Sequence, residues 1–219
     1  MTLTTILILA TAYLIGALPS AYLAGRRHGV HLRELGDGNL GTKNTYHVLG
    51  LKPALWVGAL DIGKGALATG LAKTLSDEPL LPYLAALAAA IGHDFSVYIR
   101  FAGGKGMATV LGSLLVLQPV ESLLGLGLAG LALLVLRNWD LAWSLGMGST
   151  LAWSLYLRRP AWQSLWLVIL LVSIGLKKLI DLPRQRRTHA AATRIHTQSP
   201  DDLSPGNGAE HAPVHRPNH

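Results

Sequence analysis

Apolar runs recur along most of the chain, and they restrict the possible fold more than any other feature of the sequence. Several approach the roughly 20 residues that an α-helix needs to cross the hydrocarbon core of a bilayer. The chain is 50% hydrophobic and only 14% charged, whereas soluble domains are roughly 25% charged. Leu, Ala and Gly outnumber the β-branched residues, which favours helices over a transmembrane barrel. The composition therefore predicts an all-α, polytopic membrane protein without a separate soluble domain.

Seven segments are candidate transmembrane helices: residues 3–24, 51–72, 80–99, 107–118, 120–136, 139–157 and 161–180. The fourth would reach only about 18 Å at about 1.5 Å per residue, against about 30 Å for the hydrocarbon core. If all seven cross, fifteen Lys and Arg residues lie on one side and three on the other, whereas each side holds nine if the fourth turns back. Because positive charge collects in cytoplasmic loops, we expect seven crossings, with the N-terminus outside and the C-terminus in the cytoplasm.

The chain is expected to divide into a helical membrane domain, residues 1–182, and a disordered cytoplasmic tail, residues 183–219. The tail is rich in Pro, His, Ser and charged residues and has few large apolar side chains. Its histidines are irregularly spaced, so we expect them to be solvated and to bind no metal. They are His189, His196, His211, His215 and His219.

Charge and cysteine content narrow the possible functions. The chain has no cysteine, which excludes thiol catalysis and Cys-ligated zinc or iron–sulfur sites. Its net charge of +7 is dispersed at segment ends, without an aromatic-rich basic groove beside it. We therefore expect the basic residues to orient the chain and to bind anionic headgroups of membrane lipids, and we expect no nucleic acid partner.

A glycine-rich basic turn lies within residues 92–109, GHDFSVYIRFAGGKGMAT. Gly103, Gly104 and Gly106 carry no Cβ, so the backbone can approach a ligand and direct N–H groups toward it, while Lys105 supplies positive charge. A helix beginning at Met107 would direct its positive dipole end to the same point. The turn therefore predicts a phosphate site at the membrane surface. The alternative is an interfacial loop whose lysine extends to the headgroups.

The first long loop, residues 31–50, reads HLRELGDGNLGTKNTYHVLG and combines glycines with amide, hydroxyl and charged side chains. This composition predicts a compact turn that binds a polar ligand, although a loop that only caps helices has a similar composition. The candidate ligand-binding residues are Gly36, Asp37, Gly38, Asn39, Gly41, Lys43 and Asn44.

Ionisable residues inside the apolar segments are further candidates. Asp61 and Lys64 are three residues apart, so they share one face of a helix. Charges in hydrocarbon are costly unless they are paired or face a cavity, which indicates a functional role or an ion pair that holds helices together. His93 ends the third segment, where it either acts as a base or hydrogen-bonds a helix end.

Four motifs together resemble the bacterial membrane family of acyl-phosphate:glycerol-3-phosphate acyltransferases. They are LIGALPSAYLAG, GDGNLGTKNTYHVLG, DIGKG and GHDFSVYIRFAGGKGMAT, in the family's order and within residues 14–112. The resemblance implies a seven-helix enzyme of the bacterial cell inner (plasma) membrane. It also implies transfer of a fatty acyl group from acyl phosphate to glycerol 3-phosphate, forming lysophosphatidic acid for phospholipid biosynthesis. No metal or organic cofactor is implied, and a soluble phosphate acyltransferase is the expected supplier of acyl phosphate.

The resemblance also implies roles for residues at the cytoplasmic face. It assigns phosphate binding to the first loop and to the glycine turn, with Lys43, His47 and Arg100 as further candidates, and we expect catalysis from Asp61, Lys64, His93 and Lys105. Asp37 and His47 stand where the family has serine and arginine, and Val172 and Gly175 stand where it has a histidine and an asparagine. The competing hypotheses are a catalytically weakened relative that binds acyl phosphate or anionic lipid as a scaffold or regulator, and a small transporter of phosphorylated compounds.

Overall fold

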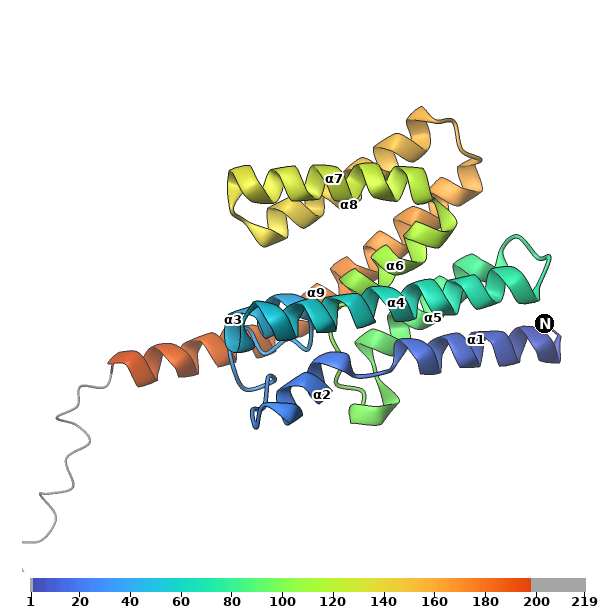
Figure 1. The fold of residues 1–219 in the computed structure, drawn as a ribbon. Coiled ribbons are helices and arrows are strands. Elements are labelled where there is room, and N and C mark those ends of the chain that lie inside the picture. Colours follow the sequence, from blue (N-terminus) through green and yellow to red (C-terminus); the bar gives the residue numbers. More distant parts are fainter. Residues whose placement is uncertain (1, 198–219) are drawn as a thin grey trace, which may run out of the picture.

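The structure is a computed structural model that describes residues 2–197, and every regular element in that range is a helix (Figure 1). The helices are α1 (Leu3–Gly16), α2 (Ser20–Arg27), α3 (Thr42–Leu49), α4 (Leu51–Leu75), α5 (Leu81–Asp94), the short 3₁₀ helix η1 (Val97–Ile99), α6 (Met107–Leu117), α7 (Pro119–Leu136), α8 (Trp139–Tyr156) and α9 (Ala161–Thr197). The predicted all-α fold is confirmed, and so is the predicted start of a helix at Met107. Two stretches in the described range are long and apolar enough to cross a membrane by length and composition, Leu3–Arg27 and Pro119–Leu136.

The first apolar segment is broken at Pro19, between α1 and α2. Proline has no backbone N–H and disfavours helical dihedrals in the preceding residue, so regular helical bonding ends here. Two carbonyl groups at the break accept side-chain hydrogen bonds: Ser96 Oγ donates to Ala17 O at 2.5 Å and Lys64 Nζ donates to Leu18 O at 2.9 Å. The break therefore joins the first segment to α4 and to the chain that follows α5.

Two further boundaries differ from the sequence prediction. Residues 42–49 form α3, although the whole region 31–50 was expected to be a loop. The last helix continues past Pro183 to Thr197, so the predicted boundary at 182/183 falls inside α9. Alanine and arginine, which favour helices, are frequent in this extension. The remainder of the predicted tail, residues 198–219, lies outside the described residues.

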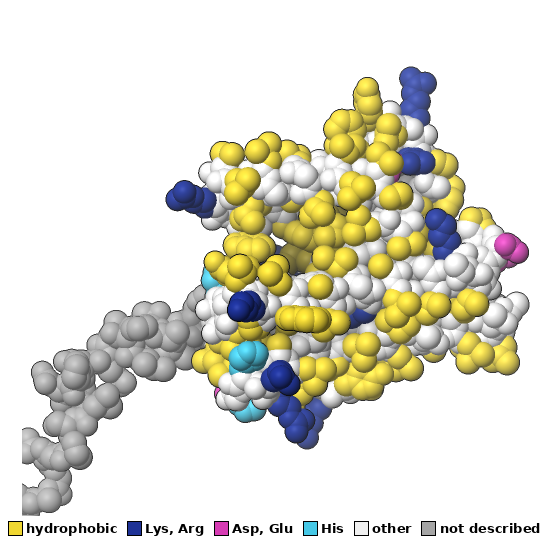
Figure 2. Space-filling view, viewed as in Figure 1, with side chains coloured by type: hydrophobic (Ala, Val, Ile, Leu, Met, Phe, Trp, Pro, Cys, Tyr) yellow, Lys and Arg dark blue, Asp and Glu magenta, His cyan; other side chains and the backbone are white. Residues whose placement is uncertain are grey.

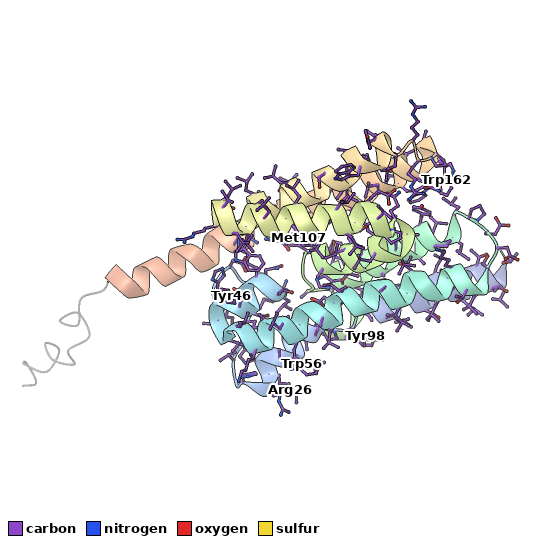
Figure 3. All side chains as sticks on the ribbon, turned by 45° about the horizontal axis from the view of Figure 1, so that its top comes forward. Arg26, Tyr46, Trp56, Tyr98, Met107 and Trp162 are labelled. Carbon is purple, nitrogen blue, oxygen red and sulfur yellow. The ribbon has the colours of Figure 1, made fainter. Side chains whose placement is uncertain are left out.

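The helices form a bundle with an appended hairpin. In Figure 1, α1, α4 and α5 run side by side, α7 and α8 form an antiparallel pair, and α6 and α9 connect the two groups. Hydrophobic side chains cover most of the face seen in Figure 2, with a hollow between the hairpin and α4 and with Lys and Arg at the edges. Tyr46 of α3 and Trp162 of α9 lie at opposite ends of the molecule (Figure 3).

The crossing of α4 and α6 depends on glycine. A Cβ on Gly65 would lie 1.9 Å from the carbonyl oxygen of Thr109, and a Cβ on Gly112 would lie 1.9 Å from that of Ile62. Because each glycine faces the backbone of the other helix, the two axes approach more closely than larger residues would permit. This crossing brings the charged part of α4 close to the start of α6, where the glycine turn ends.

We expect Gly65→Ala to lower the melting temperature of the detergent-solubilised protein, because its methyl group would overlap Thr109 O and overpacking costs about 1–3 kcal/mol. Gly63→Ala is the matched control, since it lies on the same helix and its Cβ would meet no atom within 4 Å. The control should melt at or above the wild-type temperature, because alanine favours a helix over glycine by up to about 1 kcal/mol. Equal melting temperatures for the two variants would contradict the close crossing.

Candidate functional site

A buried polar centre joins α2, α4 and α5 around Asp61. Ser20 Oγ donates a short hydrogen bond to Asp61 Oδ1, and Lys64 Nζ lies 2.9 Å from the same oxygen. His93 Nδ1 is 3.7 Å from it. Asp61 is 1% exposed and Lys64 6% exposed, so both charges lie away from solvent and are paired with each other. We call Ser20, Asp61, Lys64 and His93 the Asp61 centre; the structure brings together the three of its members that the sequence indicated.

The Asp61 centre keeps unused hydrogen-bonding capacity. Asp61 Oδ2 and His93 Nδ1 are buried without a hydrogen-bond partner among the side chains and backbone groups that the structure describes. Buried polar atoms are normally paired, and exceptions often occur where a ligand binds. A narrow cavity lies beside the centre, lined among others by Ser20, Lys64, His93, Gly103 and Gly104. The centre is therefore positioned to interact with a polar group that reaches this cavity.

The glycine turn packs against the end of α5. Gly103 N donates to Asp94 O at 3.2 Å and Gly104 N donates to His93 O at 3.1 Å. A Cβ on Gly103 would lie 1.8 Å from His93 O, and a Cβ on Gly104 would lie 2.3 Å from His93 Nε2. The expectation that these two N–H groups face a ligand is therefore wrong, because carbonyls at a helix C-terminus lack intrahelical partners and take both donors. The turn caps α5 and thereby fixes the position of Lys105.

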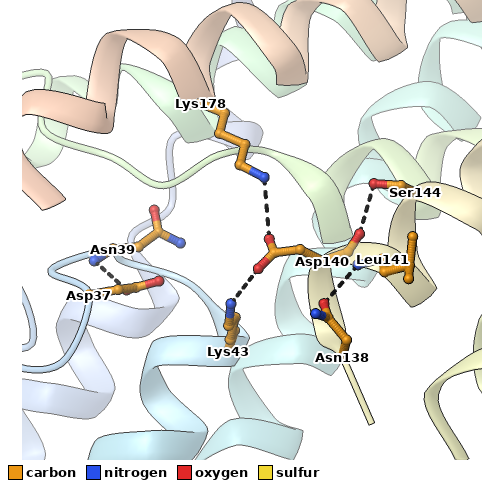
Figure 4. Close-up of polar contacts among 8 residues, drawn as sticks. All are labelled: Asp37, Asn39, Lys43, Asn138, Asp140, Leu141, Ser144 and Lys178. Carbon is orange, nitrogen blue, oxygen red and sulfur yellow. Dashed lines mark hydrogen bonds and ion pairs between the residues drawn. The ribbon is translucent and has the colours of Figure 1, made fainter. Parts of the chain in front are cut away.

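Lys105 belongs to a group of three lysines from separate elements, which we call the lysine cluster: Lys43 of α3, Lys105 of the turn and Lys178 of α9. Asp140, in the first turn of α8, links two of them, because its Oδ2 lies 2.7 Å from Lys43 Nζ and its Oδ1 lies 3.5 Å from Lys178 Nζ (Figure 4). Lys105 is 7% exposed. Burial lowers the pKa of Lys105 from its ordinary value, while Asp37 and Asp140 act to raise it.

The first loop is held in shape by Asn44. Its Oδ1 accepts a hydrogen bond from the Asp37 N–H at 2.9 Å, and its Nδ2 donates to Leu32 O at 2.8 Å and to Leu35 O at 3.0 Å. Gly36 has φ +60, and a Cβ there would lie 2.1 Å from Asn44 Oδ1. Asn44, which is fully buried, therefore organises the loop from inside.

The remaining loop candidates lie around Asp37. Asp37 Oδ1 accepts a hydrogen bond from the Asn39 N–H at 3.0 Å (Figure 4). Asn39 Oδ1 is buried and has no hydrogen-bond partner in the described part of the structure. Gly38 has φ +66, and Gly41 precedes the first residue of α3. This part of the loop thus places one carboxylate within electrostatic range of Lys105 and leaves one buried amide oxygen available to a donor.

Two sequence candidates are not brought into contact with the lysine cluster. His47 is exposed, and its ring packs edge-on against Tyr46 with the centroids 5.5 Å apart. Arg100 is exposed at the end of η1, with φ 55. Neither side chain makes a hydrogen bond or ion pair to another residue in the described part of the chain. The structure therefore gives them no part in a preformed site.

A second buried ion pair anchors α9 beside the turn. Lys177 Nζ lies 2.7 Å from Asp181 Oδ2 and 5.3 Å from the centroid of the Phe95 ring. Asp94, beside this pair, would be 2.9 Å from a Cβ on Gly106. Gly106 has φ +67 and directly precedes α6, so glycine is required there by both backbone conformation and space.

Three members of the site had no role assigned from the sequence: Asp140, Ser20, which lies within the motif LIGALPSAYLAG, and Lys178, which belongs to a basic pair with Lys177 that the family resemblance includes. Asp140 is the only charged residue within residues 139–157, and the rule that singled out Asp61 would also have found it. Ser20 directly follows the proline at which the first segment breaks. Among the side chains that the structure describes, no cluster of three or more His, Cys, Asp or Glu is arranged to hold a metal ion.

The family model and the known proteins that this chain resembles carry the same description. The family model described as glycerol-3-phosphate acyltransferase matches residues 6–181. A glycerol-3-phosphate acyltransferase of Thermus thermophilus is 39% identical over 167 residues, covering 75% of this chain and 83% of the relative. Glycerol-3-phosphate acyltransferase 1 of Deinococcus radiodurans is 42% identical over 177 residues, covering 78% of this chain and 88% of the relative.

The fold also has solved counterparts. The crystal structure of PlsY, an integral membrane glycerol 3-phosphate acyltransferase, in its glycerol 3-phosphate form superposes with a TM-score of 0.76 at 26% identity. That match covers 83% of this chain and 91% of the solved chain. The lysophosphatidic acid form of the same protein gives a TM-score of 0.74 at 25% identity. The membrane character predicted from composition is thereby confirmed.

We expect Asp61→Asn to destabilise the fold, because Lys64 would keep its charge without an anionic partner and breaking a buried pair costs about 3–5 kcal/mol. The measurement is the thermal unfolding of the detergent-solubilised protein. Asp77→Asn is the control, since it removes one exposed carboxylate from the loop after α4 and should leave the melting temperature unchanged. Adding Lys64→Met to Asp61→Asn should recover part of the loss; a double variant less stable than the single one would contradict the ion-pair argument.

Proposed function

The chain belongs to the glycerol-3-phosphate acyltransferase family, and from this premise we propose that it transfers a fatty acyl group from acyl phosphate to glycerol 3-phosphate at the cytoplasmic face of the membrane. It is an acyltransferase of phospholipid synthesis that acts on glycerol 3-phosphate. We propose that acyl phosphate is the donor, and we also propose the roles of individual residues and the membrane topology. The lysine cluster is the observation that carries it, because both substrates of this reaction bear phosphate groups.

The proposed reaction balances without a further reactant. The 1-hydroxyl oxygen of glycerol 3-phosphate attacks the acyl carbon, the bond between that carbon and the bridging phosphate oxygen breaks, and lysophosphatidic acid forms. The leaving phosphate ends with the hydroxyl proton as hydrogen phosphate. Acyl phosphate is already activated, so the protein has mainly to align the reactants and to neutralise their charge. Lysines and backbone dipoles meet that requirement, so the proposal includes no metal or organic cofactor.

The lysine cluster and the Asp61 centre suit different parts of this reaction. Lys43 and Lys178 are 29% and 50% exposed, which suits a phosphate that arrives from the cytosol, as that of glycerol 3-phosphate does. Lys64 and His93 line the narrow cavity behind the glycine turn, where they would stabilise charge on the acyl phosphate. Lys105 lies at the turn between α5 and α6 and would contact a phosphate from within the protein. A phosphate bound there would supply negative charge to this buried lysine.

Departures from the family pattern are consistent with this assignment. Asp37 adds negative charge near Lys105, and His47 lacks the permanent charge of arginine. Lys43 contributes a positive charge on the same helix as His47 and faces Asp140 with its ammonium group. We infer that Lys43 supplies the phosphate contact for which the family pattern uses an arginine.

We expect the purified protein to convert acyl phosphate and radiolabelled glycerol 3-phosphate to lysophosphatidic acid, and to give no product with acyl-coenzyme A as donor. Lys105→Ala should lower kcat/KM for glycerol 3-phosphate about 10- to 100-fold, because a hydrogen bond to a charged group contributes about 1.5–3 kcal/mol. Lys52→Ala is the charge-matched control, since Lys52 is exposed at the start of α4.

Two results would contradict the proposal. Equal activity of Lys105→Ala and Lys52→Ala would remove Lys105 from the site. Absence of turnover together with tight binding of acyl phosphate would favour a scaffold or regulator. If lysophosphatidic acid does form, the soluble phosphate acyltransferase remains the proposed supplier of acyl phosphate.

We propose seven crossings of the bacterial plasma membrane, with both the lysine cluster and the C-terminus in the cytoplasm. Because the chain has no cysteine, single cysteines can report the side on which each loop lies. We expect a membrane-impermeant maleimide to label Asp77→Cys in intact spheroplasts, and to label His28→Cys only after permeabilisation. Both positions are exposed in the structure. Labelling of both from the same side would contradict the topology.

A further inference from the structure

Asp140 occupies an unusual position for a carboxylate in a phosphate site. Its two oxygens contact different lysines, Oδ2 contacting Lys43 at 2.7 Å and Oδ1 contacting Lys178 at 3.5 Å (Figure 4). Lys105, the third lysine, also interacts electrostatically with Asp140. A single carboxylate thus lies where an anionic ligand of the lysine cluster would bind.

We propose that Asp140 acts as an internal competitor for phosphate: it holds Lys43 and Lys178 in the free protein, and the phosphate of the substrate must displace it to bind. This inference rests on the proposed function, because it takes the lysine cluster as the glycerol 3-phosphate site. It assigns to Asp140 the role of a residue that determines affinity and specificity without contacting the reacting atoms.

The charges favour displacement by phosphate. A carboxylate carries one negative charge and two oxygens, whereas a phosphate monoester carries about −1.5 to −2 and three oxygens that accept hydrogen bonds. With three lysines nearby, the more highly charged group gains more attraction. In the free protein, the carboxylate reduces the repulsion among the lysines and keeps them close together.

The exposure of Asp140 permits such a displacement. The side chain of Asp140 is 46% exposed, so it can turn toward solvent, whereas Asp61 and Asp181 are 1% and 5% exposed. The backbone near Asp140 is held independently, because Asn138 caps α8 through Leu141 N and Ser144 Oγ donates to the Asp140 carbonyl (Figure 4). The carboxylate can therefore leave the lysines while α8 keeps its start.

Displacement would have two consequences. A neutral alcohol cannot replace a carboxylate on two lysines, so Asp140 would select phosphorylated acceptors over glycerol. Release of Asp140 would also remove an ionic link between α8 and both α3 and α9. The ring contact of Trp139 with Tyr46, with centroids 6.2 Å apart, would remain as a link between α8 and α3.

The test compares Asp140→Asn with wild type. We expect two constants to fall about 3- to 10-fold: the dissociation constant for inorganic phosphate, measured by calorimetry, and KM for glycerol 3-phosphate. The reason is that phosphate no longer has to break the pairs of Asp140 with Lys43 and Lys178, and each partly exposed pair changes an equilibrium constant by up to about fivefold. The value of kcat should stay within about twofold, because the reacting atoms are not contacted. Asp140→Glu should behave like wild type, since it restores the competing charge.

Matched variants separate this role from others. Asp77→Asn removes the same charge far from the lysine cluster and should leave both constants unchanged. If Asp140→Asn melts well below wild type, Asp140→Ser gives a second measurement with the same expected direction. In folded variants, a rise in KM or in the phosphate dissociation constant would overturn the proposal and would assign Asp140 to positioning the lysines. No change in either constant would also overturn it.

Phosphate binding and turnover distinguish the inference from the function on which it rests. If wild type makes no lysophosphatidic acid but Asp140→Asn still binds inorganic phosphate more tightly, the acyltransfer proposal fails and the competitor role stands. If wild type turns over normally and Asp140→Asn shows no gain in phosphate affinity, the competitor role fails and the acyltransfer proposal stands.

Discussion

A buried ammonium group is the constraint on which the site depends. Lys64 lies in the apolar part of α4, where burying an unpaired charge is unfavourable by far more free energy than one hydrogen bond contributes. Asp61, one turn earlier, and the carbonyl of Leu18 at the break in the first segment are its two partners. Asp61 in turn binds Ser20 and lies beside His93. The need to satisfy one lysine thus ties α4 to the α1–α2 junction and to the end of α5, which is where the glycine turn packs.

Features that follow from local pattern could be predicted from the sequence. Runs of apolar residues located the long helices but not the short polar helix α3, and a spacing of three placed Asp61 and Lys64 on one face. Contacts between distant segments could not be predicted in this way. Nothing near Ser20 or Asp140 in the chain indicates that one binds Asp61 and the other contacts Lys43 and Lys178. Pro19 did carry a local signal of the break, but the surrounding hydrophobicity favoured a continuous helix.

The charges of the site nearly balance before any substrate arrives. Asp61 neutralises Lys64 in the interior, while Asp140 and Asp37 offset part of the charge of the more exposed lysine cluster. The two phosphorylated substrates of the proposed reaction would therefore meet a site with lysines already gathered and only a modest surplus of positive charge. This arrangement suits repeated binding and release, because a stronger surplus would also retain the phosphate that leaves.

The packing of Gly103 and Gly104 on α5 limits which residues can change as the sequence of this protein evolves. Both residues are needed to accommodate the end of a helix, whether or not any ligand binds nearby. A descendant that had lost acyl transfer would still be selected to keep them, since a larger residue would disturb its fold. Retention of the glycine pair therefore indicates only that the architecture is kept, whereas retention of the chemistry is indicated by the lysines and their acidic partners.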